Sequence, residues 1–83
     1  MKVLYFARFR QIIGRASDEI EIPADVKNVS HLLAHLIAGD AGCAAAFANP
    51  KLIKTAVDQN YVTLDFPLAG AKEVAFFPPV TGG

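Results

Sequence analysis

The last nine residues of the chain, AFFPPVTGG at positions 75–83, have the composition of a reactive terminus. The two prolines lack a backbone N–H group, so they cannot donate to a sheet, and they favour the extended polyproline II conformation. The two final glycines have no Cβ atom that would obstruct a narrow passage. We therefore expect residues 78–83 to form an extended tail that presents a terminal carboxylate to another protein. The alternative is a disordered end without a function. Such ends are rarely preceded by large apolar residues and stiff prolines.

Two other candidates for chemistry are weaker. His31 and His35 are four residues apart, a spacing that can hold a metal on one helix face. They lie opposite the apolar stripe of the predicted helix and have no third ligand nearby, so we predict solvated histidines and no metal. Cys43 has glycine and alanine neighbours and no adjacent cation that would lower its pKa. It is predicted to be a small buried apolar residue and not a nucleophile.

The charged residues near the first predicted turn have two interpretations. Three arginines lie there: Arg8, Arg10 and Arg15. They could bind a phosphate or an acidic partner, but we favour solvated side chains without a specific ligand. The acidic residues that follow alternate with isoleucines and are predicted to be the solvent side of a strand: Asp18, Glu19 and Glu21. The sequence has no phosphate-binding loop, no dinucleotide fingerprint and no plausible catalytic triad. It therefore gives little support to an enzyme that acts alone.

Composition narrows the class of protein. The 83 residues contain eight basic and eight acidic side chains, so the net charge is zero, which argues against nucleic acid and against anionic membranes as partners. A single cysteine excludes an internal disulfide and fits a reducing compartment. There is no signal peptide and no apolar run of roughly 20 residues, so we expect a cytoplasmic protein. Only 19% of residues are charged, against about 25% typically, which predicts exposed apolar surface and a protein partner.

The elements that would position the tail follow from hydrophobic periodicity. Residues 2–9 predict an inner strand, residues 10–15 a helical turn that ends at Gly14, and residues 18–22 a strand that pairs antiparallel with the first. An amphipathic helix then follows, with Asn28 as N-cap and Gly39 just beyond its end. Its apolar stripe consists of Val29, Leu32, Leu33, Leu36 and Ile37.

The last third of the chain returns to the strand period. Residues 40–48 predict a short second helix, and strands are expected in LIKTAV, in YVTL after a turn at 58–60, and in EVAFF. The order strand, strand, helix, strand, strand favours a mixed four- or five-stranded sheet wrapped on one main helix. We thus predict an α+β protein with the β-grasp architecture, in which residues 1–77 form a single domain and residues 78–83 a tail.

Three segments resemble a known family. The ending EVAFFPPVTGG, residues 73–83, is similar to that of the small subunits of molybdopterin synthase, which are ubiquitin-like sulfur carriers. The segments VLYFARFRQIIG (3–14) and TAVDQNYVTLDFPLAG (55–70) resemble the same family. The Phe-Phe-Pro-Pro-Val approach separates this family from other carriers that end in Gly-Gly. Two departures concern Asp58, where the family usually has Asn, and Ala71-Lys72, where its approach to Glu73 is acidic.

The resemblance implies a function and its participants. Gly83 would be adenylated by an ATP-dependent adenylyltransferase, converted to a thiocarboxylate with sulfur from a donor protein, and used to deliver sulfur to a pterin precursor. The acceptor would be the large subunit of molybdopterin synthase, in a complex of two small and two large subunits. That subunit would supply the catalytic residues, and this chain would bind no cofactor tightly.

The residues expected to bind partners all lie in the C-terminal segment, although either phenylalanine could instead belong to the core: Phe76, Phe77, Pro78, Pro79, Val80, Thr81 and Gly82. Three alternatives stay open. The first is a sulfur carrier for thiamine, cysteine or thiolated tRNA. The second is a ubiquitin-like modifier that Gly83 joins to lysine, and the third is an interaction module with an inert tail.

Overall fold

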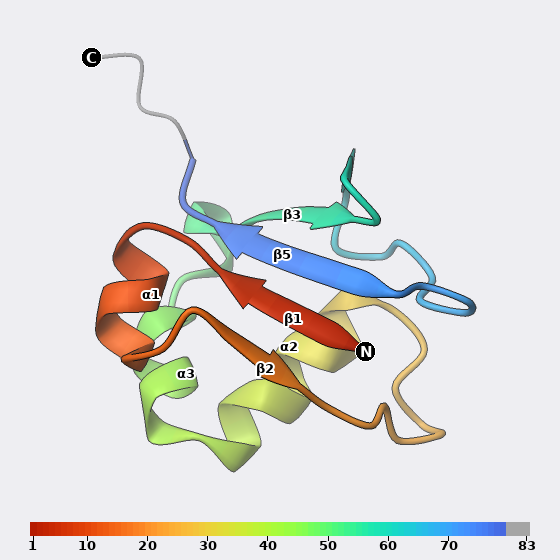
Figure 1. The fold of residues 1–83 in the computed structure, drawn as a ribbon, viewed down its shortest axis with the longest axis horizontal. Coiled ribbons are helices and arrows are strands. Elements are labelled where there is room, and N and C mark those ends of the chain that lie inside the picture. Colours follow the sequence, from red (N-terminus) through yellow and green to blue (C-terminus); the bar gives the residue numbers. More distant parts are fainter. Residues whose placement is uncertain (80–83) are drawn as a thin grey trace.

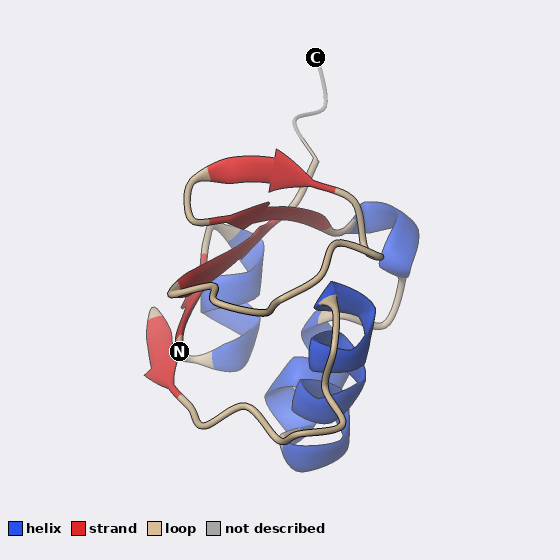
Figure 2. Ribbon diagram, turned by 90° about the vertical axis from the view of Figure 1, so that its right-hand side faces the viewer, coloured by secondary structure: helices blue, strands red, loops and turns tan. Residues whose placement is uncertain are grey.

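The computed structural model describes residues 1–79; residues 80–83 lie outside the described part. A five-stranded mixed sheet forms one layer, and α2 with α3 forms the other (Figures 1 and 2). The strand order is β2-β1-β5-β3-β4. The predicted β-grasp fold, a mixed sheet of four or five strands on one main helix, is confirmed, and the sheet has five strands. In chain order the elements are β1 (Lys2–Tyr5), α1 (Arg8–Ile13), β2 (Ser17–Glu19), α2 (Val29–Gly39), α3 (Ala41–Ala46), η1 (Pro50–Leu52), β3 (Lys54–Val57), β4 (Asn60–Val62) and β5 (Glu73–Phe77).

The last strand, β5, occupies the middle of the sheet. It pairs parallel with β1 on one side, where Tyr5 lies opposite Phe76, and antiparallel with β3 on the other, where Lys54 lies opposite Phe77. Beyond the end of β1, the Phe6 N–H donates to the Phe76 carbonyl at 3.1 Å. Hydrogen bonds on both sides therefore hold the point from which the C-terminal residues continue.

The main helix α2 has the predicted cap and most of the predicted core face. The Asn28 carboxamide oxygen accepts a hydrogen bond from the His31 N–H at 2.8 Å, which satisfies a free donor of the first turn. Four stripe residues are buried against the sheet: Val29, Leu32, Leu33 and Leu36. Ile37 lies at the border of the stripe and is 36% exposed.

The end of α2 differs from the prediction. Gly39 is the last helical residue and not the residue beyond the helix, so that prediction is wrong. The chain turns at Asp40, whose carboxylate accepts hydrogen bonds from the N–H groups of Gly42 and Cys43. Asp40 thereby caps α3, the short helix predicted over residues 40–48. Asp40, in an extended conformation, therefore ends α2 and caps α3, in place of the predicted glycine beyond the end of α2.

The first strand is shorter than predicted. It ends at Tyr5, and α1 begins at Arg8, whereas the sequence predicted a strand over residues 2–9. Phe9 reaches the core from the helix and packs edge-on against Phe47, with ring centroids 5.1 Å apart. Gly14, with φ near 88°, ends α1 as expected.

The second strand is shorter and starts earlier than predicted. It covers Ser17–Glu19, whereas the prediction was residues 18–22. It still pairs antiparallel with β1, with Lys2 opposite Glu19, so the predicted hairpin is confirmed. Ile20 and Ile22 follow the strand and pack partly buried against the core.

Asp58, which stands where the resembling family usually has Asn, lies in the turn between β3 and β4. Asp58 and Gln59 both have positive φ, 47° and 71°, as in the two-residue turns that suit hairpins and that Asp tolerates. The Asp58 carboxylate accepts hydrogen bonds from the N–H groups of Lys72 and Glu73, both at 3.0 Å. The side chain therefore ties the hairpin to the start of β5.

We predict that Thr55→Val stabilises the fold. The Thr55 hydroxyl oxygen is buried and has no hydrogen-bond partner within residues 1–79. Replacing it with a methyl group of similar size removes the cost of desolvating the hydroxyl, and we expect a gain of about 1 kcal/mol in the free energy of unfolding. Urea denaturation measures it, with Thr55→Ser as the control that keeps the hydroxyl and loses a methyl group. A loss of stability in Thr55→Val would contradict the prediction.

Candidate functional site

The base of the predicted tail lies at the end of β5. The strand ends at Phe77, and Pro78 and Pro79, which follow, are partly buried and belong to no helix or strand. Figure 1 shows β5 leaving the sheet at the end opposite to the N-terminus. The other predicted site residues lie outside the described part of the chain: Val80, Thr81, Gly82 and Gly83.

The two phenylalanines of β5 have different roles because successive strand residues point to opposite faces. Phe76 is 0% exposed and packs against Phe47 in the core, with ring centroids 5.2 Å apart. Its assignment as a partner contact is therefore corrected, and the core alternative applies. Phe77 lies on the outer face, half-buried, with its ring 5.6 Å from that of Tyr61. It stays a predicted partner contact.

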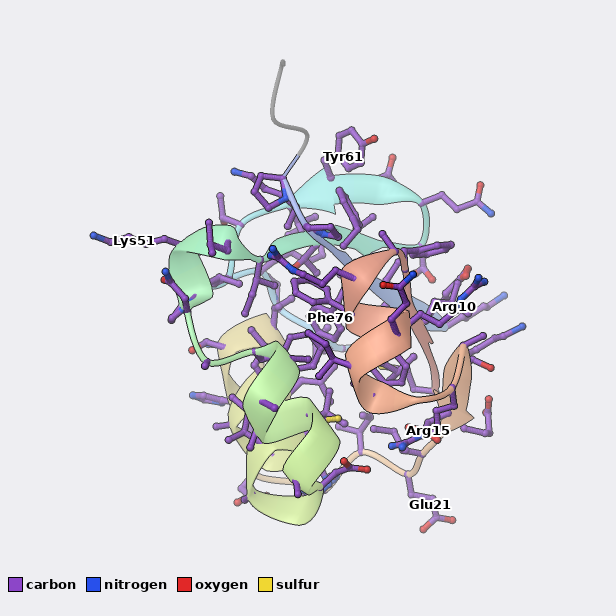
Figure 3. The ribbon with its side chains drawn as sticks, turned by 90° about the vertical axis from the view of Figure 1, so that its left-hand side faces the viewer. Arg10, Arg15, Glu21, Lys51, Tyr61 and Phe76 are labelled. Atoms are coloured by element: carbon purple, nitrogen blue, oxygen red, sulfur yellow. The ribbon has the colours of Figure 1, made fainter. Side chains whose placement is uncertain are left out.

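An open groove borders Phe77 at this end of the sheet. Its volume is about 660 Å³, and its lining is mainly apolar and aromatic: Lys54, Thr55, Tyr61, Val62, Thr63, Phe66 and Phe77. Tyr61 is 85% exposed, and Phe66 is also exposed. Figure 3 shows Tyr61 projecting from the end of the molecule at which the chain leaves β5, while Phe76 lies inside. We call these seven residues the aromatic groove.

More exposed apolar side chains lie near the end of β5. Phe6 follows β1, on the other side of β5 from the groove, and Leu52 ends η1, just before β3. The exposed apolar surface predicted from composition is thus present on both sides of the base of the tail. Sequence reasoning missed Tyr61 and Phe66 as site residues. The alternation in YVTL would have placed Tyr61 on the outer face, but nothing local to Phe66 indicates that it reaches the same groove.

The histidines and the cysteine lie apart from this groove. His31 and His35 are exposed on α2, as predicted, and the His31 Nδ1 accepts a hydrogen bond from the Lys27 N–H at 3.1 Å. Within residues 1–79, no three side chains of the metal-binding types lie together. Cys43 is buried, as predicted, and burial raises the pKa of its thiol. None of the helices in that range is long and apolar enough to cross a membrane.

Arg15 and Asp18 differ from their predicted solvated roles. The Arg15 guanidinium donates to both Asp18 carboxylate oxygens at 2.8 Å and to Asp40 at 2.7 Å. The Tyr5 hydroxyl donates to Asp18 at 2.9 Å. Hydrogen bonds from Arg15 lower the pKa of both aspartates. The network links β1, the α1–β2 turn and the α2–α3 junction. The remaining charges of the two predicted groups are exposed as expected: Arg8, Arg10, Glu19 and Glu21.

The mixed sheet with its central parallel pair β1–β5, covered by α2, defines a ubiquitin-like β-grasp protein. The fold is shared with the crystal structure of SAMP1 from Haloferax volcanii, with a TM-score of 0.77 and 21% identity over 99% of this chain and 97% of that one. Residues 3–83 match the ThiS family, and the chain belongs to that family.

Two relatives share much of the sequence. The chain is 45% identical to the molybdopterin synthase sulfur carrier subunit of Escherichia coli K12, over all of this chain and 99% of the relative. It is 35% identical, with the same coverage, to the protein of that name from Haemophilus influenzae Rd. The family that the terminal motif resembles is therefore confirmed, because both relatives carry its name.

We predict that the Arg15 network makes the free energy of unfolding decrease as the pH falls into the acid range. A carboxyl whose folded-state pKa is lowered stabilises the fold above its unfolded pKa of about 3.9 and loses this contribution as the pH falls through the folded value. Urea unfolding from neutral pH to about pH 2 should therefore show a steeper loss in the wild type than in Arg15→Gln. Arg10→Gln, at an exposed arginine of α1, serves as the control. Equal pH profiles for Arg15→Gln and the wild type would contradict this role.

Proposed function

We propose that this chain is a sulfur carrier that works with molybdopterin synthase, and that Gly83 holds the sulfur. The observation that carries the proposal is the aromatic groove at the base of a Pro-Pro segment that leads to Gly-Gly, because it joins a docking surface to a reactive terminus. Two further findings support it. The family match runs to residue 83, and a relative 45% identical bears the name of this function.

The proposed chemistry converts the unreactive Gly83 carboxylate into a group that can transfer sulfur. A carboxylate is a poor acyl electrophile because its charge is delocalised and an oxide is a poor leaving group. In the first step, a Gly83 carboxylate oxygen attacks the α-phosphorus of ATP and pyrophosphate leaves. In the second, a sulfide ion (HS⁻) supplied by the donor protein attacks the carbonyl carbon, the C–O bond to the phosphate breaks, AMP leaves, and the thioacid loses its proton. The product is a thiocarboxylate, a better nucleophile than the carboxylate.

The proposed work is divided among several proteins. ATP is bound by the adenylyltransferase, and the catalytic acids and bases belong to the large synthase subunit, which receives the tail. That subunit passes the sulfur to a pterin precursor, in a complex of two small and two large subunits. The residues of this chain have simpler parts. Gly82 passes through a narrow channel, Pro78 and Pro79 direct the tail, and Val80 and Thr81 contact the channel wall.

The aromatic groove supplies the proposed docking surface. Tyrosine and phenylalanine give large contact areas at a small cost in side-chain entropy, and aromatic residues dominate the energetics of many interfaces. Phe77 is fixed by the backbone pairing of β5 with β3, and Tyr61 packs beside it. A partner that covers this groove would hold the base of the tail at a fixed distance from its own active site.

We predict that loading depends on Gly83. Incubation of the full chain with the adenylyltransferase, ATP and sulfide should raise the intact mass by the difference between one sulfur and one oxygen atom. Deleting Gly83 should abolish this change and the formation of molybdopterin in a reconstituted synthase, while the circular dichroism spectrum is unchanged. Molybdopterin formation by the truncated chain would refute the proposal.

The same assay separates the alternatives. A carrier for thiamine, cysteine or tRNA thiolation would gain the mass but would not support molybdopterin formation with the large subunit. A ubiquitin-like modifier would instead form products of higher mass in which Gly83 is joined to lysine. An inert tail would tolerate truncation after Thr81 without any loss of activity.

We also predict that Tyr61→Ser weakens binding to the large subunit at least tenfold, because an exposed aromatic contact is lost. Tyr61 is 85% exposed, so the thermal midpoint should hardly change. Ile12→Ser, at an exposed apolar residue of α1, is the matched control and should bind like the wild type. Isothermal titration calorimetry measures both. Equal affinities for the two variants would contradict a role of the groove in docking.

A further inference from the structure

Exposed basic side chains flank the point where the chain leaves β5. Arg8 begins α1 just beyond β1, while Lys54 lies in β3 opposite Phe77, and Lys51 lies in η1 just before β3. The first two therefore stand on either side of the end of β5, and all three are exposed. We call Arg8, Lys51 and Lys54 the basic rim. Figure 3 shows Lys51 projecting outward from the molecule, on the opposite side from Arg10.

The rim is not neutralised by the carboxylates of the described residues. No hydrogen bond or ion pair within residues 1–79 involves the side chains of the rim. Asp18 and Asp40 are engaged by Arg15. Asp65, between the groove residues Thr63 and Phe66, accepts a hydrogen bond from the Thr63 hydroxyl and keeps its negative charge, so it reduces the basic excess at this end but does not pair with a rim side chain.

Most other carboxylates lie at the opposite end of the sheet. Glu19 and Glu73 both lie opposite Lys2, where β1 and β5 begin. Asp58 also belongs to that end, because it binds the N–H groups at the start of β5. Lys2, Lys27 and Lys72 lie among these carboxylates and offset them, so the far end is close to balanced, whereas the rim leaves an excess of basic side chains near the tail.

From this distribution we propose that the tail-bearing end docks on an acidic surface that surrounds the tail entrance on the large synthase subunit. The inference rests on the proposed function, since it names the chemistry of the surface that receives the tail. Complementary charge steers association and favours the orientation in which tail and entrance meet. The rim is continuous with the aromatic groove, because Lys54 lines both. The matching partner surface is apolar where it meets the groove and carries carboxylates around it.

The test compares charge reversals at the two ends of the full-length chain. Lys54→Glu and Arg8→Glu reverse charges in the rim. Lys27→Glu makes the same change in net charge at an exposed residue beside Met1, at the far end. Stopped-flow fluorescence measures the association rate constant with the large subunit from the same source as this chain. The salt concentration is varied from about 0.01 M to about 1 M, which shortens the screening length from about 30 Å to about 3 Å.

At low salt, each rim reversal is expected to lower the association rate constant by about 3- to 10-fold, and Lys27→Glu by less than about 2-fold. High salt should bring all four proteins to similar rates. Equal rates for rim and control variants, or faster association of a rim variant, would overturn the acidic surface. If the wild type does not bind the large subunit, the inference falls together with the proposed function. If it binds and its sulfur reaches the pterin while the rim reversals have no effect, the inference alone fails.

Discussion

The pairing of β5 between β1 and β3 is the constraint on which the rest of the molecule depends. A strand that is hydrogen-bonded on both sides cannot rotate, so the alternation of its side chains decides which residues serve the core and which face outward. Phe76 completes an aromatic cluster with Phe47, and Phe77 reaches the groove. A shift of one residue would exchange them, and it would place the base of the tail on the wrong face of the sheet.

Much of the fold could be predicted because several local signals agree. The apolar stripe and Asn28 cap define α2, and the alternating β5 sequence defines the last strand. The failures have physical causes. Phe9 is apolar in a strand and in a helix alike, so the apolar pattern alone predicts a strand that runs through it, whereas the chain has already turned into α1. Arg15 and Asp40 are 25 residues apart, and their ion pair exists only because the α2–α3 junction folds back beside the α1–β2 turn.

The part of the candidate site that lies in one continuous segment could be predicted from the sequence. The part that is brought together by the tertiary fold could not. The Pro-Pro-Val-Thr-Gly-Gly ending can be recognised from the sequence alone. Which phenylalanine belongs to the core depends on the register of β5, and the groove brings together Tyr61, Phe66 and Phe77 from different segments. Asp58 is an intermediate case. Its departure from Asn was visible, but the hydrogen bonds of its carboxylate to the start of β5 appear only in the folded chain.

The size of the domain explains why recognition and chemistry would be separated in a carrier of this kind. A chain of this length buries roughly 60% of its surface and supports one thin core, and here aliphatic side chains and a cluster of aromatic rings fill that core. The aromatic groove is open and not an enclosed cavity, so it can bind a partner's surface but cannot exclude water from a reaction. A reactive terminus on such a domain needs a second protein to enclose it. The surface that a partner would recognise is then expected around the base of the tail, where the aromatic groove lies.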